Sequence, residues 1–119
     1  MSRFTDQFVI SAALPTSANG STGPVDVRKY QSFSIQATFN QAGPATGAGN
    51  LLLQGSNDQT TPPTNFTTLA GTTTAYTGAT TTLVFDPIVT NLRWIRVSAA
   101  GTSGAGGLVA LEFNGVWES

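Results

Sequence analysis

The sequence predicts an all-β protein: a single-domain, antiparallel, jelly-roll-like β-sandwich with about eight strands. Three observations support this fold class. Glycine, proline and threonine interrupt every window, so no segment keeps a 3.6-residue period for three turns. Several short segments alternate apolar and polar residues, as half-buried strands do. No linker or fixed-period repeat divides the 119 residues, a length typical of one domain, which we place at 1–119.

The expected elements follow in order along the chain. The first strand, 7–14, ends at Pro15, and a flexible turn occupies 16–23. The loop 40–50 is rich in glycine and proline, and the adjacent prolines of 57–65 exclude regular structure there. Further strands are expected at 25–30, 32–39, 51–56, 66–71, 72–85 with a break near Gly78, 92–99 and 108–117.

The apolar faces of the clearest strands predict the core. In 32–39 the odd-numbered residues are apolar and the even-numbered residues are polar, as in a sheet with one wet face. The segment "LLLQGS" (51–56) is apolar on both faces, which indicates a central strand. The side chains expected to be buried are Phe33, Ile35, Phe39, Leu52, Ile95, Val97, Leu111 and Phe113.

Charge and composition argue against several classes of partner. Five basic and six acidic side chains nearly cancel, and charged residues are only 9% of the chain. Without a basic stripe, neither nucleic-acid binding nor a polybasic membrane patch is expected. No apolar run approaches the length of a membrane span, and the start "MSRFTDQFVI" lacks the apolar core of a signal peptide.

The same composition argues against an enzyme. The chain has no histidine and no cysteine, so a Ser-His-Asp triad, thiolate chemistry and Cys- or His-based metal sites are excluded. The acidic residues form no local cluster, and nothing around Lys29 indicates a depressed pKa. We therefore expect no catalytic residue, no cofactor and no metal. A calcium site at Asn57 and Asp58 is the alternative to a plain turn there.

Two segments invite a functional interpretation. The glycines of "GAGG" (104–107) lie between two strands and lead into no helix, so a hairpin turn is expected in place of a phosphate-binding loop. In "LRWIRV", Ile95 and Val97 share one face, and Trp94 and Arg96 share the other. Trp94 either caps the rim of the sandwich or provides a sugar-stacking platform or subunit contact. The candidate interface residues are Phe4, Phe8, Trp94, Arg96 and Trp117.

The pattern "LLLQGSNDQ…NFTTLAG…LRWIRVSAAG…ALEFNGV" resembles two known kinds of protein. It is similar to discoidin-like, galactose-binding-like β-sandwiches, in which a Gly-Ser-Asn-Asp turn precedes a short aromatic strand. An aromatic-Ile-Arg-Val strand and a closing Glu-aromatic-x-Gly strand follow. A similar shortened pattern occurs in small bacteriophage structural proteins of capsids and tails. The resemblance covers residues 51–116, and the absence of cysteine favours the bacteriophage kind.

This resemblance implies a bacteriophage virion structural protein. A capsid decoration (cement) protein or a small capsid or vertex subunit is the first hypothesis, with other capsid proteins as partners and the virion, assembled in the host cytoplasm, as location. A carbohydrate- or receptor-binding module of a tail or spike, with a surface glycan as ligand, is the alternative. Scarce charge and aromatic residues near both ends of the chain predict a homo-oligomer, a trimer first and a pentamer second.

Overall fold

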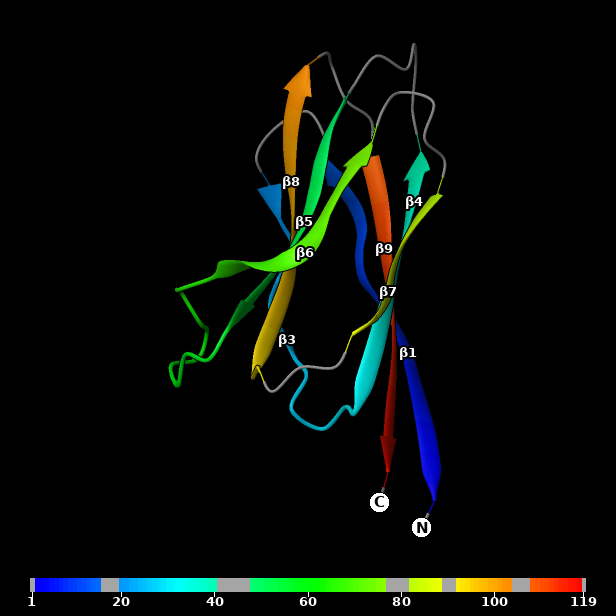
Figure 1. Ribbon diagram of the computed structural model, residues 1–119, viewed down its shortest axis with the longest axis vertical. Helices are drawn as coiled ribbons and strands as arrows, with labels where there is room; N and C mark the ends of the chain where they lie inside the picture. Colours follow the sequence, from blue (N-terminus) through cyan, green and yellow to red (C-terminus); the bar gives the residue numbers. More distant parts are fainter. Residues whose placement is uncertain are drawn as a thin grey trace.

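Nine strands form two antiparallel sheets in the part of the chain that the structure describes (Figure 1). The computed structural model describes residues 2–15, 20–40, 48–76, 82–88, 92–103 and 108–118. The strands are β1 (Arg3–Pro15), β2 (Gly20–Ser21), β3 (Val25–Asp26), β4 (Ser32–Asn40), β5 (Ala48–Ser56), β6 (Thr67–Tyr76), β7 (Thr82–Ile88), β8 (Trp94–Ser103) and β9 (Leu108–Glu118). Among these residues no helix is long and apolar enough to cross a membrane.

The strand order is that of a jelly roll. Sheet A has the order β1-β9-β4-β7, and sheet B has the order β2-β8-β5-β6, with β3 also paired to β8. The pairs β1–β9, β2/β3–β8, β4–β7 and β5–β6 are nested, as in one long ribbon of paired strands folded over itself. Such folding produces two packed sheets, and it confirms the predicted all-β antiparallel sandwich.

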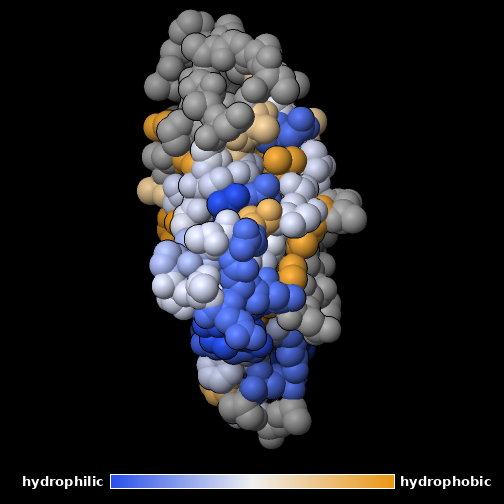
Figure 2. Space-filling model, turned by 90° about the vertical axis from the view of Figure 1, so that its left-hand side faces the viewer, coloured by the Kyte–Doolittle hydropathy of each residue, from blue (hydrophilic) through white to orange (hydrophobic). Residues whose placement is uncertain are grey.

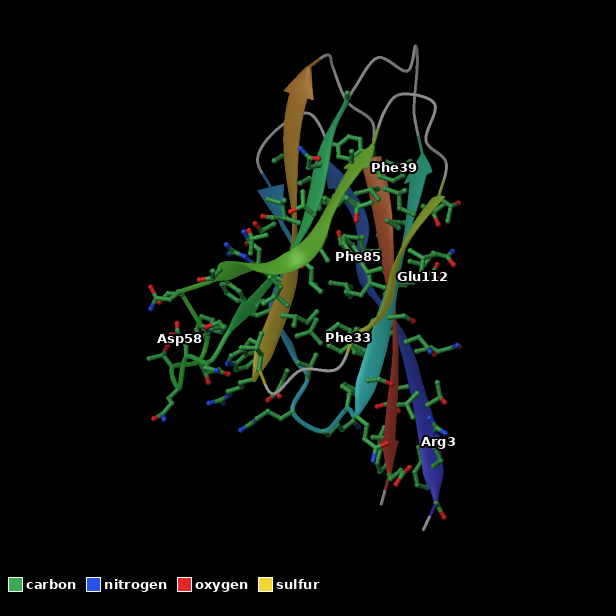
Figure 3. The ribbon with its side chains drawn as sticks, viewed as in Figure 1. Arg3, Phe33, Phe39, Asp58, Phe85 and Glu112 are labelled. Carbon is green, nitrogen blue, oxygen red and sulfur yellow. The ribbon has the colours of Figure 1, made fainter. Side chains whose placement is uncertain are left out.

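The core lies between the sheets, where the alternation of β4, β8 and β9 places its apolar residues. Phe33 and Phe85 point into this space and Glu112 points away from it (Figure 3). Six of the eight expected core residues are buried, namely Phe33, Ile35, Ile95, Val97, Leu111 and Phe113. Phe39 is only partly buried. Leu52 was assigned to the wrong face, because Leu51 and Leu53 on either side of it are 0% exposed.

Several predicted element bounds differ from the structure. The segment 25–30 is strand only at β3, and the residues after it turn, with the Tyr30 amide donating to the carbonyl of Val27 at 3.1 Å. β6 joins the expected strand 66–71 to the start of 72–85, and the break expected near Gly78 lies outside the described residues. The loop 57–65 has no strand, as predicted.

The hairpin predicted at 104–107 is wrong. Those residues lie outside the described part, but the strands on either side, β8 and β9, belong to different sheets and do not pair with each other. A hairpin requires that consecutive strands be hydrogen-bonded neighbours. The sequence signals a turn here without saying which sheet the chain enters next.

The central position predicted for 51–56 is confirmed, since β5 lies between β8 and β6.

The two ends of the chain lie side by side and extend beyond the other strands (Figure 1). The register joins Arg3 to Glu118 and continues without a shift to the pair of Val9 and Glu112. We call residues 3–8 of β1 and 113–118 of β9 the terminal ribbon. It contributes to the elongated shape of the molecule, which measures 49 × 28 × 23 Å.

Candidate adhesion surface

The exposed apolar side chains of the described residues gather on one sheet. The larger of them belong to β1, β7 and β9, which are all strands of sheet A: Phe4 (41% exposed), Phe8 (38%), Val9 (57%), Val84 (53%) and Leu108 (38%). Sheet B presents a different surface, where hydrophilic side chains predominate over the strands and the loop before β6 (Figure 2). Exposed apolar side chains concentrated on one sheet are typical of a protein-protein contact.

Aromatic pairs connect the core to the terminal ribbon. Phe33 and Phe8 both stack on Phe113, with ring centroids 5.4 and 4.6 Å from it. Phe4 stacks on Trp117 with ring centroids 4.5 Å apart, in the residue pair next to Arg3 and Glu118. All these rings lie on the face of sheet A that, farther along the strands, packs against sheet B to form the core. The ribbon therefore carries a row of rings out of the sandwich, and the outermost ones remain partly in contact with solvent.

An ion pair ties the ribbon to the segment after β3. Lys29 Nζ lies 2.8 Å from Asp6 Oδ2, and the Tyr30 hydroxyl donates a hydrogen bond of 2.8 Å to the same oxygen. The Lys29 hydrogen bond and then the Tyr30 one lower the pKa of Asp6 from 3.8 to about 2. Burial and the Asp6 carboxylate raise the pKa of Tyr30 to about 12. Lys29 Nζ also lies 4.6 Å from the ring centre of Trp117, a cation–π contact.

Gly115 allows this packing. A Cβ added at Gly115 would lie 2.5 Å from Cδ1 of Tyr30 and 2.7 Å from Cε1 of Phe113. Real side chains do not approach so closely, and both neighbours are rings, one of them in the core. Glycine at this position therefore lets Tyr30 lie directly against β9, where its hydroxyl reaches Asp6.

The outer face of sheet A holds a groove of about 540 Å³. The register places Val9, Glu112, Gln36 and Val84 in one row across all four strands, with a valine at each end. Asn114 Oδ1 is buried there and accepts no hydrogen bond from the described residues. The full lining is Gln7, Phe8, Val9, Ser34, Gln36, Val84, Glu112, Phe113 and Asn114.

Trp94 and Arg96 lie on sheet B, away from the other three candidate residues. Trp94 is 9% exposed, and its indole Nε1 donates to the carbonyl of Asp58 at 3.1 Å. Arg96 Nε donates to Gln54 Oε1 at 2.7 Å, and its guanidinium lies 4.2 Å from the ring centre of Phe66. Both side chains thus hold the loop and strands around them, and Arg96 is the more accessible of the two.

Asp58 organises the loop 57–65. Its Oδ2 accepts hydrogen bonds of 2.8 Å from the backbone amides of Thr64 and Asn65, and the Asp58 amide donates to Ser56 Oγ at 3.0 Å. The two amide bonds, Asn65 first, hold the pKa of Asp58 below its usual value. The turn role predicted for Asp58 is therefore confirmed. Among the described residues, no group of three or more acidic side chains lies together where it could hold a metal ion.

The structure thus brings together Phe4, Phe8 and Trp117 and separates them from Trp94 and Arg96. Val9, Val84 and Leu108 were left out of the candidate interface, although Val9 and Val84 are more exposed than Phe4 and Phe8, and Leu108 is as exposed as Phe8. In β7 and β9, alternate residues face the core, so Val84 and Leu108 point to the side away from their buried sequence neighbours. Correct assignment of this alternation would have found these two. Val9 stands between Phe8 and Ile10, so the sequence of β1 shows no alternation that would assign Val9 to the outer face.

Two solved structures are similar to this one. The crystal structure of the SPBc2 prophage-derived protein YomS aligns with a TM-score of 0.64 at 11% identity, over 98% of this chain and 96% of that chain. These two chains share a fold. The crystal structure of FLHE aligns at 13% identity over 99% and 97% of the two chains, but its TM-score of 0.39 supports no argument. No protein-family model and no curated protein matches the sequence.

Proposed function

We propose that this protein is a bacteriophage virion structural protein, a capsid decoration (cement) protein or small capsid (vertex) subunit that stabilises the shell by protein-protein contacts. The observation that carries the proposal is the confinement of exposed Phe4, Phe8, Val9, Val84 and Leu108 to sheet A. Burying such side chains against a neighbour contributes about 25 cal/mol per Å² of apolar surface. The mechanism needs no catalytic residue, cofactor or metal.

Fold and sequence pattern support a phage origin. YomS, which shares the fold, is a prophage-derived protein by its title. Jelly rolls occur widely in viral capsid domains, although a fold alone does not determine function. The resemblance of residues 51–116 to small phage structural proteins points the same way. With only 9% charged residues, the chain has few groups that would keep copies apart in a crowded shell.

Other capsid proteins and further copies of this chain are the proposed partners, in a trimer first and a pentamer at a vertex second. The terminal ribbon and the outer face of sheet A are adjacent surfaces, so one copy can contact two neighbours at once. A stable contact of this kind buries on the order of 1,000 Å² or more in total.

Copy number in purified particles tests the proposal. Quantitative mass spectrometry of virions separated from free protein should find this chain in many copies per particle, as expected for a shell component. A few copies per particle would instead favour a tail or spike position. Absence from particles that contain the other structural proteins would contradict the virion role altogether.

The groove on sheet A supports the alternative, a carbohydrate- or receptor-binding module. Its amide, hydroxyl and carboxylate side chains suit sugar hydroxyls, and the unpaired Asn114 Oδ1 could accept from one. A glycan array probed with the purified protein tests this function. Selective binding that is lost in Asn114→Ala and Gln36→Ala, and kept in Thr68→Ala on sheet B, would support it.

A further inference from the structure

The outer edge of β1 has the properties of a strand-pairing surface. β1 pairs with β9 on one side, and no described residue pairs with its other side along 3–9. An edge strand presents unpaired backbone N–H and C=O groups, and natural proteins usually protect such edges with lysine, proline or a bulge. Segment 3–9 contains no lysine and no proline, and its register shifts begin only after Val9.

The sequence of this edge is symmetric about Asp6. The run "FTDQF" (4–8) places a phenylalanine two residues to each side of Asp6 and a polar residue directly beside it. A twofold interface requires that each residue meet its counterpart reciprocally. If two such segments pair antiparallel around Asp6, Phe4 of each copy lies opposite Phe8 of the other, and Thr5 lies opposite Gln7.

We propose that two copies of this chain join through antiparallel pairing of residues 3–9 of β1 about a twofold axis at Asp6. The two copies of sheet A then form one continuous sheet across the contact. This inference rests on the self-association proposed above and specifies its contact. A trimer can be part of the same assembly, since the twofold contact can join two trimers into a hexamer.

Side-chain contacts favour this pairing. Phe4 and Phe8 are 41% and 38% exposed in one copy, and aromatic pairs directly across two strands stabilise a sheet. The opposed Asp6 carboxylates would repel each other if they were unpaired. Each is bound by its own Lys29 Nζ at 2.8 Å, so the centre of the contact holds two neutral ion pairs.

The composition of the edge favours a second copy over a foreign strand. Arg3 and Asp6 give segment 3–9 no net charge, so it neither attracts a charged partner nor repels its own kind. A strand of another capsid protein would need to supply a matching Phe-x-x-x-Phe spacing. A second copy supplies it by definition.

Single-cysteine variants test the contact directly, because the natural chain contains no cysteine. Thr5→Cys and Gln7→Cys are prepared separately, mixed, and oxidised. Directly opposed residues have Cα atoms about 4.5–5.5 Å apart, which a disulfide can span. The mixture should give a covalent dimer on a non-reducing gel. Either variant alone should not, because the same residue in the two copies would be a diagonal neighbour about 7–8 Å away.

Light scattering of the purified wild-type chain completes the test. A species of two or six times the 12.3 kDa chain mass is expected. Phe8→Ser should shift it toward half that mass, and Thr68→Ala, at an exposed position of sheet B, should not. A monomer or a simple trimer, or cross-linking by Thr5→Cys alone, would overturn the pairing. The virion role is judged separately by copy number in particles.

Discussion

At Gly115, the addition of a single methyl group would disturb the packing of β9 against its neighbours. Gly115→Ala should lower the free energy of unfolding by about 1–3 kcal/mol, because the new Cβ would collide with Tyr30 and Phe113. Gly23→Ala is the matched control, since nothing lies within 4 Å of a Cβ at that position. It should change stability by less than about 0.5 kcal/mol. Urea unfolding measures both, and equal stability of the two variants would contradict the packing described here.

Core residues at the centres of β4 and β9 should carry much of the stability. Ile35 is 0% exposed and Phe113 is 1% exposed, so truncation of either leaves a cavity between the sheets. Ile35→Ala or Phe113→Ala should cost about 2–5 kcal/mol in urea unfolding. Thr38→Ala, on the exposed face of β4, serves as the control. A loss under about 0.5 kcal/mol at both core sites would mean that the strand parity is wrong.

Element bounds and strand parity were predictable where a strand alternates. In β4 the residues from Ser32 to Thr38 alternate without exception, and the structure buries the predicted face. In β5 three consecutive leucines give no alternation, so Leu52 was placed inward, although Leu51 and Leu53 face the core. Two-residue strands such as β2 leave no periodic signal. Long-range register also leaves none, so the stacking of Phe4 on Trp117 was not foreseen.

The loop 57–65 depends on one carboxylate. Asp58→Ala removes the acceptor for the Thr64 and Asn65 amides and should make the loop more susceptible to limited proteolysis, while Gln59→Ala should not. Because these amides already occupy Asp58 Oδ2, adding EDTA should leave the thermal midpoint of the wild type unchanged. A fall of many degrees in EDTA would revive the calcium alternative at Asn57 and Asp58.

The contact between β1 and the segment after β3 should make stability depend on acidity. Asp6 titrates near 2 in the folded chain and near 3.8 otherwise, so the unfolded chain binds more protons between these values. The stabilisation is therefore present above about pH 4 and is lost as the pH falls toward 2. Asp26 and Asp58, whose pKa values are also lowered, act in the same direction.

Two variants isolate the contribution of Asp6. Asp6→Asn should make the free energy of unfolding fall less steeply as the pH falls below about 4, although Asp26 and Asp58 still contribute. Lys29→Met should move the loss to higher pH, because the largest cause of the low pKa of Asp6 is then gone. Thermal unfolding between about pH 2 and pH 5 measures both effects. Curves that keep the wild-type slope in both variants would show that this ion pair does not form in solution.

At the scale of the whole molecule, the distribution of charge determines how association responds to salt. Charged residues are 9% of the chain, and the exposed side chains of sheet A that we assign to contacts are mainly apolar. Raising sodium chloride from about 0.1 to about 1 M shortens the screening length from about 10 Å to about 3 Å and would dissociate a complex held by surface charges. We expect the oligomer mass in light scattering to remain unchanged, and ammonium sulfate to strengthen association, because sulfate increases the tendency of apolar surface to be buried.

Phe8→Ser should make association weaker at every salt concentration, whereas Arg96→Gln on sheet B should leave it unchanged. Dissociation by sodium chloride alone would show that ion pairs hold the copies together, and it would contradict adhesion through the exposed apolar side chains of sheet A.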